Sequence, residues 1–180
     1  MNSTKLYALA LLPLLAVAPR SGRDTHADVV STIAAFKEKD PDIGKFFDSA
    51  IGYAVFPTVG KGAIGVGGAH GTGELLVGEK AIGKAALNQL TVGFQLGGQA
   101  YSEIIFFDQQ STFDGFKHGD FAFAAQATAV ALTTGASANA AYRNGVAVFT
   151  MPKGGLMAQA AIGTQKLRFR PLNEGMATDR

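Results

Sequence analysis

The sequence predicts a mainly β domain with flanking helices, an α+β fold whose antiparallel sheet is barrel-like or sandwich-like. Two observations lead to this prediction. Short apolar stretches alternate with glycines over most of the chain, which has 23 glycines among 180 residues. Helical patterns are limited to the N-terminal third and one short internal stretch. The length is that of a single domain.

One glycine-rich phrase occurs nearly twice. The first copy spans Tyr53 to Gly73 and the second spans Val146 to Lys166. Each runs from A-V-F through a K-G turn into a segment dense in glycine and alanine, and then reaches G-T. The repeat predicts two related β-hairpins in related positions of the sheet.

The N-terminal residues have the pattern of an export signal. Lys5 precedes an apolar stretch from Leu6 to Ala18, which ends in a small-x-small site. The stretch is shorter than the roughly 20 residues of a membrane-spanning helix. We therefore expect a signal peptide at 1–18 and an exported, periplasmic or envelope-associated protein. Pro19 leaves open the alternative that the segment stays as an uncleaved anchor.

The first helices are expected between the signal and the sheet. Residues 19–27 form a linker or helix start, and a helix follows over Asp24 to Lys39. Asp40 and Pro41 end this helix and begin a second, short one, as N-cap and first helical residue. Both helices have an apolar face. One interpretation is that they cover a sheet. The other is that Val29, Ile33 and Phe36 insert into a membrane surface.

The rest of the domain is expected to be strands with one more helix. A short helix is predicted over Asp108 to Lys117, with Phe113 and Phe116 buried and Gly119 as its stop. Residues 121–132 have both helical and strand character, and the strand is favoured. The domain is expected to cover 28–171, with a polar tail at 172–180. The remaining strands are predicted at 53–56, 63–69, 74–77, 87–96, 100–107, 146–150, 156–162 and 166–169, with turns at Gly60, Gly71, Gly73, Gly78, Gly83 and Gly97–Gly98.

The composition excludes several kinds of chemistry. The chain has no cysteine, which removes thiolate catalysis, cysteine-based metal sites and a lipoprotein anchor. The net charge is +2 and no run of basic residues is long, so nucleic acid is not an expected partner. The three histidines are far apart and lack metal-ligand spacing. No metal or other cofactor is therefore expected.

Two glycine-rich segments resemble nucleotide-binding loops only in part. Residues 60–65 match G-x-G-x-x-G, but no helix can follow them, so a β-turn is expected there. Residues 78–85 lack the final Ser or Thr of a phosphate-binding loop. Glu103 lies in an apolar stretch, where it is either an acid of raised pKa or, more commonly, a residue that faces solvent or pairs with lysine. We expect no catalytic residue and no enzymatic activity.

Basic residues at the turns and on the last strand suggest an anion site. Lys61 and Lys153 occupy equivalent places in the two copies of the repeat, and Lys166, Arg168 and Arg170 alternate along the last strand. Together they are candidates to bind anionic head groups. The alternative is that they keep turns and sheet edges soluble.

Three segments resemble the SYLF domain family: G-Y-A-V-F-P-T-V-G-K-G (52–62), F-Q-L-G-G-Q-A-Y-S-E-I-I-F-F (94–107) and V-A-V-F-T-M-P-K-G-G-L-M-A (146–158). The resemblance spans about Asp28 to Pro171. It implies a lipid-binding module, because eukaryotic relatives bind phosphoinositides and a yeast relative also binds actin. Bacterial relatives are exported, often as lipoproteins.

The expected function is therefore non-enzymatic binding of anionic lipid or a membrane surface, through basic turns beside an apolar surface. The alternative is a structural cell-envelope protein that self-associates through its Gly/Ala-rich hairpins.

Overall fold

The computed structural model describes residues 22–64, 66–92, 99–119, 122–124, 129–154 and 164–172. The helices are α1 (Gly22–Lys39), α2 (Gly44–Ser49) and α3 (Gln110–His118), and a 3-10 turn at Pro41–Ile43 precedes α2. The strands are β1 (Gly52–Ile64), β2 (Val66–Val77), β3 (Lys80–Val92), β4 (Gln99–Phe107), β5 (Ala122–Ala124), β6 (Ala129–Ala131), β7 (Val146–Lys153) and β8 (Thr164–Pro171).

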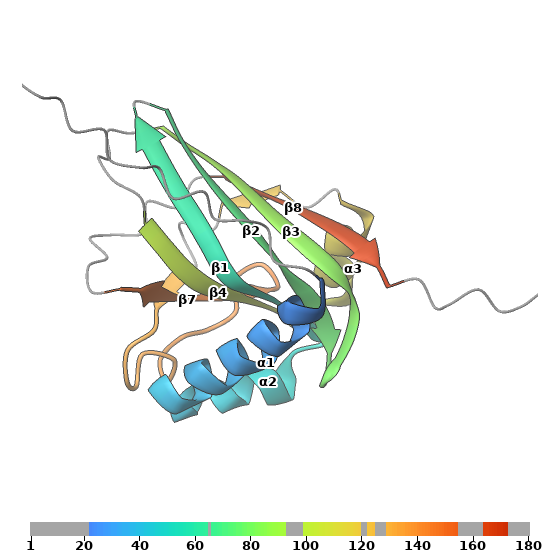
Figure 1. Cartoon of the computed structure of the whole chain (residues 1–180). Helices are drawn as coiled ribbons and strands as arrows, with labels where there is room; N and C mark the ends of the chain where they lie inside the picture. The colour runs from blue at the N-terminus through green and yellow to red at the C-terminus, as the bar shows by residue number, and fades with distance from the viewer. Residues whose placement is uncertain are drawn as a thin grey trace, which may run out of the picture.

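All of these strands belong to one sheet, in the order β5-β8-β3-β2-β1-β4-β7-β6 (Figure 1). The pairings are antiparallel except for β6 with β7, which is parallel. The predicted α+β class with a predominantly antiparallel sheet is confirmed. The sheet is curled but open, because no described residues pair its end strands β5 and β6 with each other.

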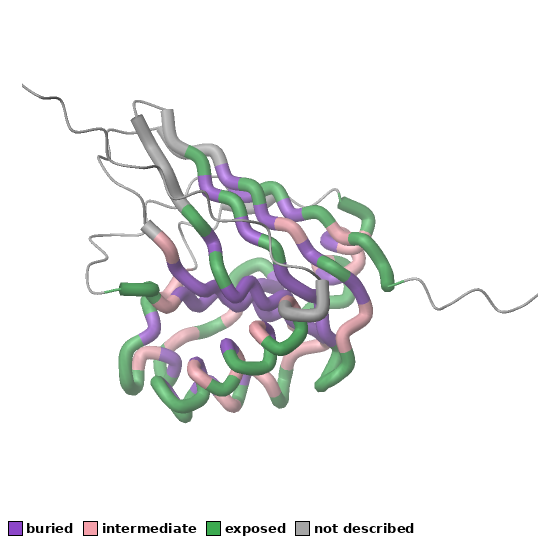
Figure 2. Tube along the Cα trace, viewed as in Figure 1, coloured by how far each residue is buried: buried purple, intermediate pink, exposed green. Residues whose placement is uncertain are grey.

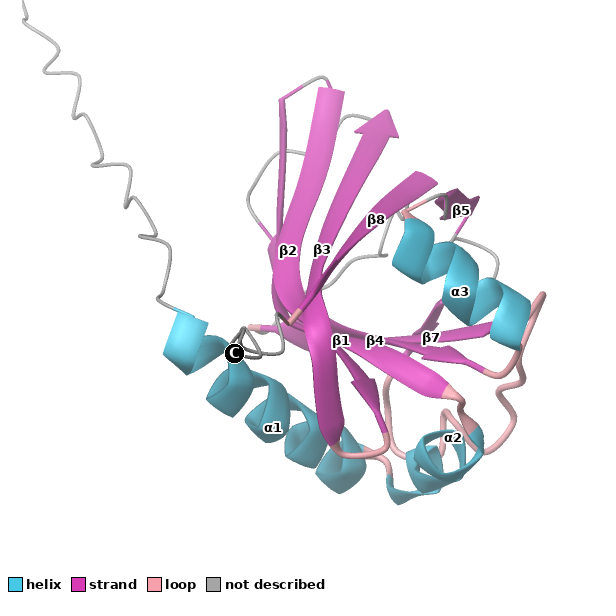
Figure 3. Ribbon diagram, turned by 90° about the vertical axis from the view of Figure 1, so that its right-hand side faces the viewer, coloured by secondary structure: helices cyan, strands magenta, loops and turns pink. Residues whose placement is uncertain are grey.

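The sheet buries a different core on each face. On the outer face lie α1 and α2, and on the inner face lies α3 (Figure 3). Because side chains alternate along a strand, neighbouring residues of β1 and β4 enter opposite cores. The outer core includes Val29, Phe36, Phe46, Tyr53, Val55, Ile104, Phe106 and Phe149. The inner core includes Ala54, Phe56, Leu87, Tyr101, Ile105, Phe107, Phe113, Phe116 and Leu167.

The junction between α1 and the 3-10 turn is built on Asp40. Its carboxylate caps the turn by accepting from the backbone N–H of Asp42, as the sequence predicted. The same carboxylate accepts from the backbone N–H of Gly135, and from the backbone N–H and hydroxyl of Ser137 at 2.7 Å each. Asp40 and Ser137 are both fully buried. This carboxylate therefore fastens the loop before β7 to the helices.

The two copies of the repeat flank one central strand. Ala54 of β1 is aligned with Ile105 of β4, and Ile105 is aligned with Val148 of β7. Since β1 and β7 are both antiparallel to β4, they run in the same direction on its two sides. The two A-V-F strands thus take corresponding places beside β4, but they are one residue out of step, so that Val55 lies in the outer core and its equivalent Val148 in the inner core. The second predicted hairpin depends on residues 155–163, which lie outside the described residues.

Several glycines predicted as turns lie inside strands instead. Gly60 is within β1, Gly71 and Gly73 are within β2, and Gly83 is within β3, while Gly78 is in a turn with φ +57°. The reason is close packing of backbones: a Cβ on Gly73 would lie 1.8 Å from the carbonyl oxygen of Val55. The stretches around these glycines therefore join into strands longer than those predicted. Residues 60–64 also form strand and not the expected β-turn.

The remaining predictions have mixed outcomes. The internal helix α3 is confirmed, with Phe113 and Phe116 buried and Gly119 after its end at φ +78°. In the ambiguous 121–132 stretch, the described residues include strands β5 and β6, in agreement with the favoured interpretation. The signal segment, the 93–98 turn, the predicted strand at 156–162 and the tail at 173–180 lie outside the described residues.

Candidate anion-binding face

The last strand presents its basic residues on one face. Lys166, Arg168 and Arg170 are exposed, whereas Gln165, which precedes them, and Leu167, which lies between the first two, are buried (Figure 2). A strand that buries one face alternates in this way, because successive side chains point to opposite sides. The predicted alternation is confirmed. The three cations lie on the outer face of the sheet, opposite the inner core that contains Leu167.

The neighbouring strand adds a fourth cation. Lys84 of β3 is aligned with Arg170 and is also exposed. Sequence analysis did not select this lysine. The alternation of Lys84 with Ala85 and Leu87 could have indicated an exposed strand residue. The sequence does not show, however, that the strand of Lys84 pairs with the last strand. We call Lys84, Lys166, Arg168 and Arg170 the basic face.

Little negative charge opposes the basic face. In the rows that β2, β3 and β8 share there, the carboxylate is Glu74, aligned with Lys84. Glu74 is 5% exposed, and its Oε2 lies 2.7 Å from Nδ1 of His26 on α1. None of the four cations forms an ion pair with any residue that the structure describes. Their positive charge is thus open to an external anion.

One apolar side chain borders one end of the basic face. Leu172 follows β8 and is 43% exposed, and its backbone N–H donates to the carbonyl of Ile82 on β3. Val77 at the end of β2 is also exposed, but it follows Leu76 of the outer core, so its side chain points to the other side of the sheet. Leu172 therefore supplies exposed apolar surface beside the cations.

The other predicted basic residues lie elsewhere. Lys153 ends β7, five places from β8 in the strand order, and its Nζ donates to the hydroxyl of Thr58 at 2.7 Å. Lys61 lies in β1 and not in the predicted turn. Its backbone is aligned with Gln99, one residue out of step with the Ala100 partner of Lys153. A shared anion site of these two lysines remains a prediction.

The proposed membrane-insertion side chains face the sheet. Val29 and Phe36 are 0% exposed in the outer core, and Ile33 is half-buried against it. Among the described side chains of α1, Val30 is the exposed large apolar residue. The interpretation of the helices as a cover for the sheet is therefore confirmed, and the three side chains are not available for insertion in the folded domain.

A second polar cluster lies inside the curled sheet. Glu103 is fully buried on the inner face, and its Oε2 accepts from Nε2 of Gln165 at 3.2 Å. The hydroxyl of Tyr101 donates to Oε1 of Gln89 at 3.3 Å. Burial raises the pKa of Glu103 to about 8, although the hydrogen bond from Gln165 acts in the opposite direction. Of the sequence interpretations, the acid of raised pKa is confirmed, and the solvent-facing or lysine-paired carboxylate is wrong.

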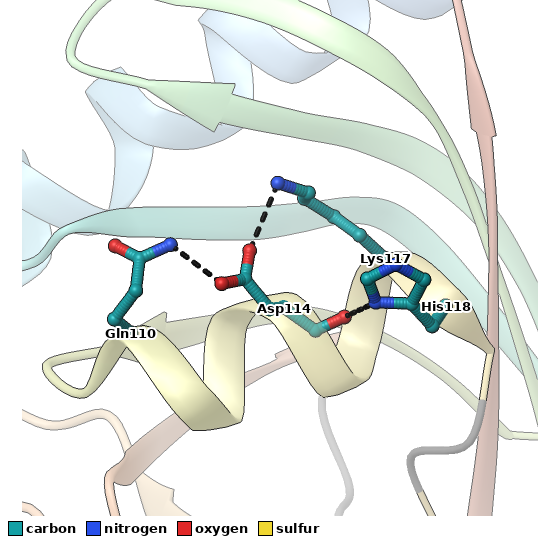
Figure 4. A network of polar contacts seen from close by, with 4 residues as sticks. All are labelled: Gln110, Asp114, Lys117 and His118. Atoms are coloured by element: carbon teal, nitrogen blue, oxygen red, sulfur yellow. Dashed lines mark hydrogen bonds and ion pairs between the residues drawn. The ribbon is translucent and has the colours of Figure 1, made fainter.

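The most connected surface network belongs to α3 alone. The carboxylate of Asp114 accepts from Nε2 of Gln110 and from Nζ of Lys117, at 2.9 Å each (Figure 4). Nδ1 of His118 lies 2.8 Å from the Asp114 carbonyl. The bonds from Gln110 and Lys117 hold the pKa of Asp114 below its ordinary value. All partners are within one helical turn, so the network stabilises α3 locally.

Comparisons with protein-family models and with curated proteins give no match to this chain. Among the described residues, no three His, Cys, Asp or Glu side chains group as metal ligands would. The described helices also lack the length and apolar character needed to cross a membrane.

Proposed function

We propose that this protein is a non-enzymatic module that binds anionic lipid head groups through the basic face. The observation that carries the proposal is the set of four exposed, unpaired cations on two adjacent strands. Sequence resemblance to the SYLF family supports the same function. Among the described carboxyls, Glu103 has a strongly raised pKa, and it is fully buried inside the sheet.

The spacing of the cations suits a flat, negatively charged surface. Alternate residues on a strand are about 6.6 Å apart and adjacent strands about 4.8 Å apart. Lys166 to Arg170 therefore covers about 13 Å, with Lys84 beside its end. Because β3 and β8 are paired, these cations are already held on one side of the sheet before a ligand binds. Leu172 supplies apolar contact next to them.

The expected affinity gain is moderate and sensitive to salt. Each well-placed Lys or Arg contributes about 1 kcal/mol near an anionic membrane. Four of them would contribute about 4 kcal/mol, close to three orders of magnitude in affinity. Because exposed charges are screened over about 8 Å at physiological ionic strength, binding should weaken as salt rises.

Vesicle flotation tests the proposal. The wild type should float with vesicles that contain anionic phospholipid and not with neutral phosphatidylcholine vesicles. The Lys84→Glu/Arg168→Glu variant should bind the anionic vesicles at least about 30-fold more weakly, since two attractions are lost and replaced by repulsions. A matched control, Lys39→Glu/Arg143→Glu, makes the same charge change at two exposed positions away from the basic face, and should stay close to wild type.

The same assay separates the competing sites. The Lys61→Glu/Lys153→Glu variant should lose less binding than the basic-face variant if β3 and β8 carry the interaction. Equal losses in the basic-face variant and its control would show a general charge effect and refute a defined site. If the wild type ignores anionic vesicles and sediments as an oligomer, self-association replaces lipid binding as the function.

A further inference from the structure

The polar cluster inside the sheet joins two strands that are far apart in it. Strand β4 is four places from β8 in the order β8-β3-β2-β1-β4. The sheet curls enough that Glu103 of β4 and Gln165 of β8 meet at 3.2 Å across the inner face (Figure 3). Both side chains are 0% exposed. This contact therefore bridges the sheet directly, without passing through the intervening strands.

Two oxygens of this contact have no hydrogen-bond partner among the described residues. They are Oε1 of Glu103 and Oε1 of Gln165. Both are acceptors if the carboxyl is ionised, so they cannot satisfy each other. Unpaired buried acceptors are costly, and a buried carboxylate without a cation is costlier. A single proton on Glu103 Oε1 supplies the missing donor.

That proton would complete a known pairing of chemical groups. A neutral carboxylic acid and a primary amide form two parallel hydrogen bonds, N–H to C=O and O–H to C=O, because each group has one donor and one acceptor in a plane. The existing bond from Gln165 Nε2 to Glu103 Oε2 is the first of these. The two unpaired oxygens are the atoms that the second requires.

Among the residues that the structure describes, none that faces Glu103 offers a charge to stabilise a carboxylate. Its ladder neighbours are Phe56 and Thr150, and α3 turns Phe113 and Phe116 toward this face. The titratable neighbour is Tyr101, whose own pKa is raised by burial and by Glu103. The titratable side chains of α3 bond within that helix: Lys117 donates to the carboxylate of Asp114, and Nδ1 of His118 lies 2.8 Å from the Asp114 backbone carbonyl.

We propose that Glu103 is held as the neutral acid and closes a two-bond ring with the amide of Gln165, forming a clasp between β4 and β8 that opens when the carboxyl loses its proton. The same strand β8 has Lys166 and Arg168 on its opposite face. Opening of the clasp would loosen β8 and so disturb the basic face in mildly alkaline solution.

Infrared difference spectroscopy of the wild type tests the protonation state directly. A carbonyl band of a protonated carboxyl should be present at pH 7 and should disappear with a midpoint at about pH 8. The band should be missing from Glu103→Gln, in which an amide–amide pair keeps both hydrogen bonds. Absence of a protonated-carboxyl band in the wild type at pH 7 would overturn the proposal.

A variant with the acid and the amide exchanged tests whether Glu103 is protonated because of the two-bond ring or because of burial alone. In Glu103→Gln/Gln165→Glu the acid and the amide trade strands, so the ring predicts that the band returns and titrates again at alkaline pH. Gln165→Leu removes the amide and should abolish both hydrogen bonds of the ring, shifting the carbonyl band toward that of a free acid. A band position in Gln165→Leu identical to wild type would contradict the ring, even if Glu103 stays protonated.

Discussion

Removal of the Asp40 carboxylate should greatly destabilise the domain. The Asp40→Ala variant leaves the backbone N–H and hydroxyl of Ser137 without an acceptor, and Ser137 is fully buried. Each buried donor left unpaired costs about 1–3 kcal/mol. The lost cap of the 3-10 turn adds about 1 kcal/mol. The expected loss is therefore about 3–7 kcal/mol, a large part of the roughly 5–15 kcal/mol typical of a domain.

The ionisation of Asp40 gives the same prediction a pH dependence. Burial alone would raise the pKa of this carboxyl, but hydrogen bonds from Ser137, Gly135 and Asp42 outweigh it and lower the pKa below 3.8. A lowered folded-state pKa contributes stability that is present above the unfolded pKa of about 3.9 and lost as pH falls through the folded value. Acid below pH 4 should thus destabilise the wild type more than Asp40→Asn.

Urea unfolding followed by circular dichroism at pH 7 and at pH 3 measures both effects. Asp42→Ala is the matched control, because Asp42 is a neighbouring carboxylate that is exposed, and its loss should cost within about 0.5 kcal/mol. A loss below 1 kcal/mol in Asp40→Ala would refute the reasoning. So would an acid response that is the same in the wild type and in Asp40→Asn.

Further predictions concern the inner face and the glycines. Because Glu103 keeps its proton in the folded state up to a pKa of about 8 and loses it near 4.5 when unfolded, wild-type stability should fall as pH rises between these values, by about 5 kcal/mol at about 1.4 kcal/mol per pH unit. Urea midpoints at pH 5, 7 and 9 should show this fall in the wild type and a flatter profile in Glu103→Gln; parallel profiles would contradict it. Gly73→Ala should lower stability by several kcal/mol, since its Cβ would overlap the Val55 carbonyl, whereas Gly60→Ala meets nothing within 4 Å and should be tolerated. Thermal melts of the two variants compare these positions, and equal melting temperatures would show that the close approach at Gly73 does not matter.

Local signals in the sequence were sufficient for the helices and for the last strand. Asp40 with Pro41 marks a helix start in any context, and the alternation of Lys166, Leu167 and Arg168 identifies a half-buried strand. The roles of the glycines were harder to predict, because a glycine in a turn and a glycine packed against a neighbouring backbone look the same in sequence. The pairing of β2 with β1 is what shows that Gly73 is packed against a neighbouring backbone.

The candidate site depended more on long-range pairing. Lys84 joins Arg170 only because β3 pairs with β8, and Glu103 reaches Gln165 only because the sheet curls. Neither fact can be derived from the spacing of residues. The helix that seemed able to enter a membrane had the same apolar stripe that a helix needs to cover a sheet. The structure decides between the two interpretations of this stripe, because Val29 and Phe36 pack against the sheet.

The place of β8 in the sheet has a consequence for the order of folding. Strands β1, β2 and β3 follow one another as hairpins and can pair while the later chain is still unformed. Strand β8 is the last strand in the chain, yet it docks on β3, as the pairing of Ala85 with Phe169 shows. Such non-local pairing slows folding. A nascent chain would thus expose the unpaired edge of β3 until β8 is synthesised and pairs with it. A chain truncated before Thr164 would leave that edge of β3 without β8 as a partner.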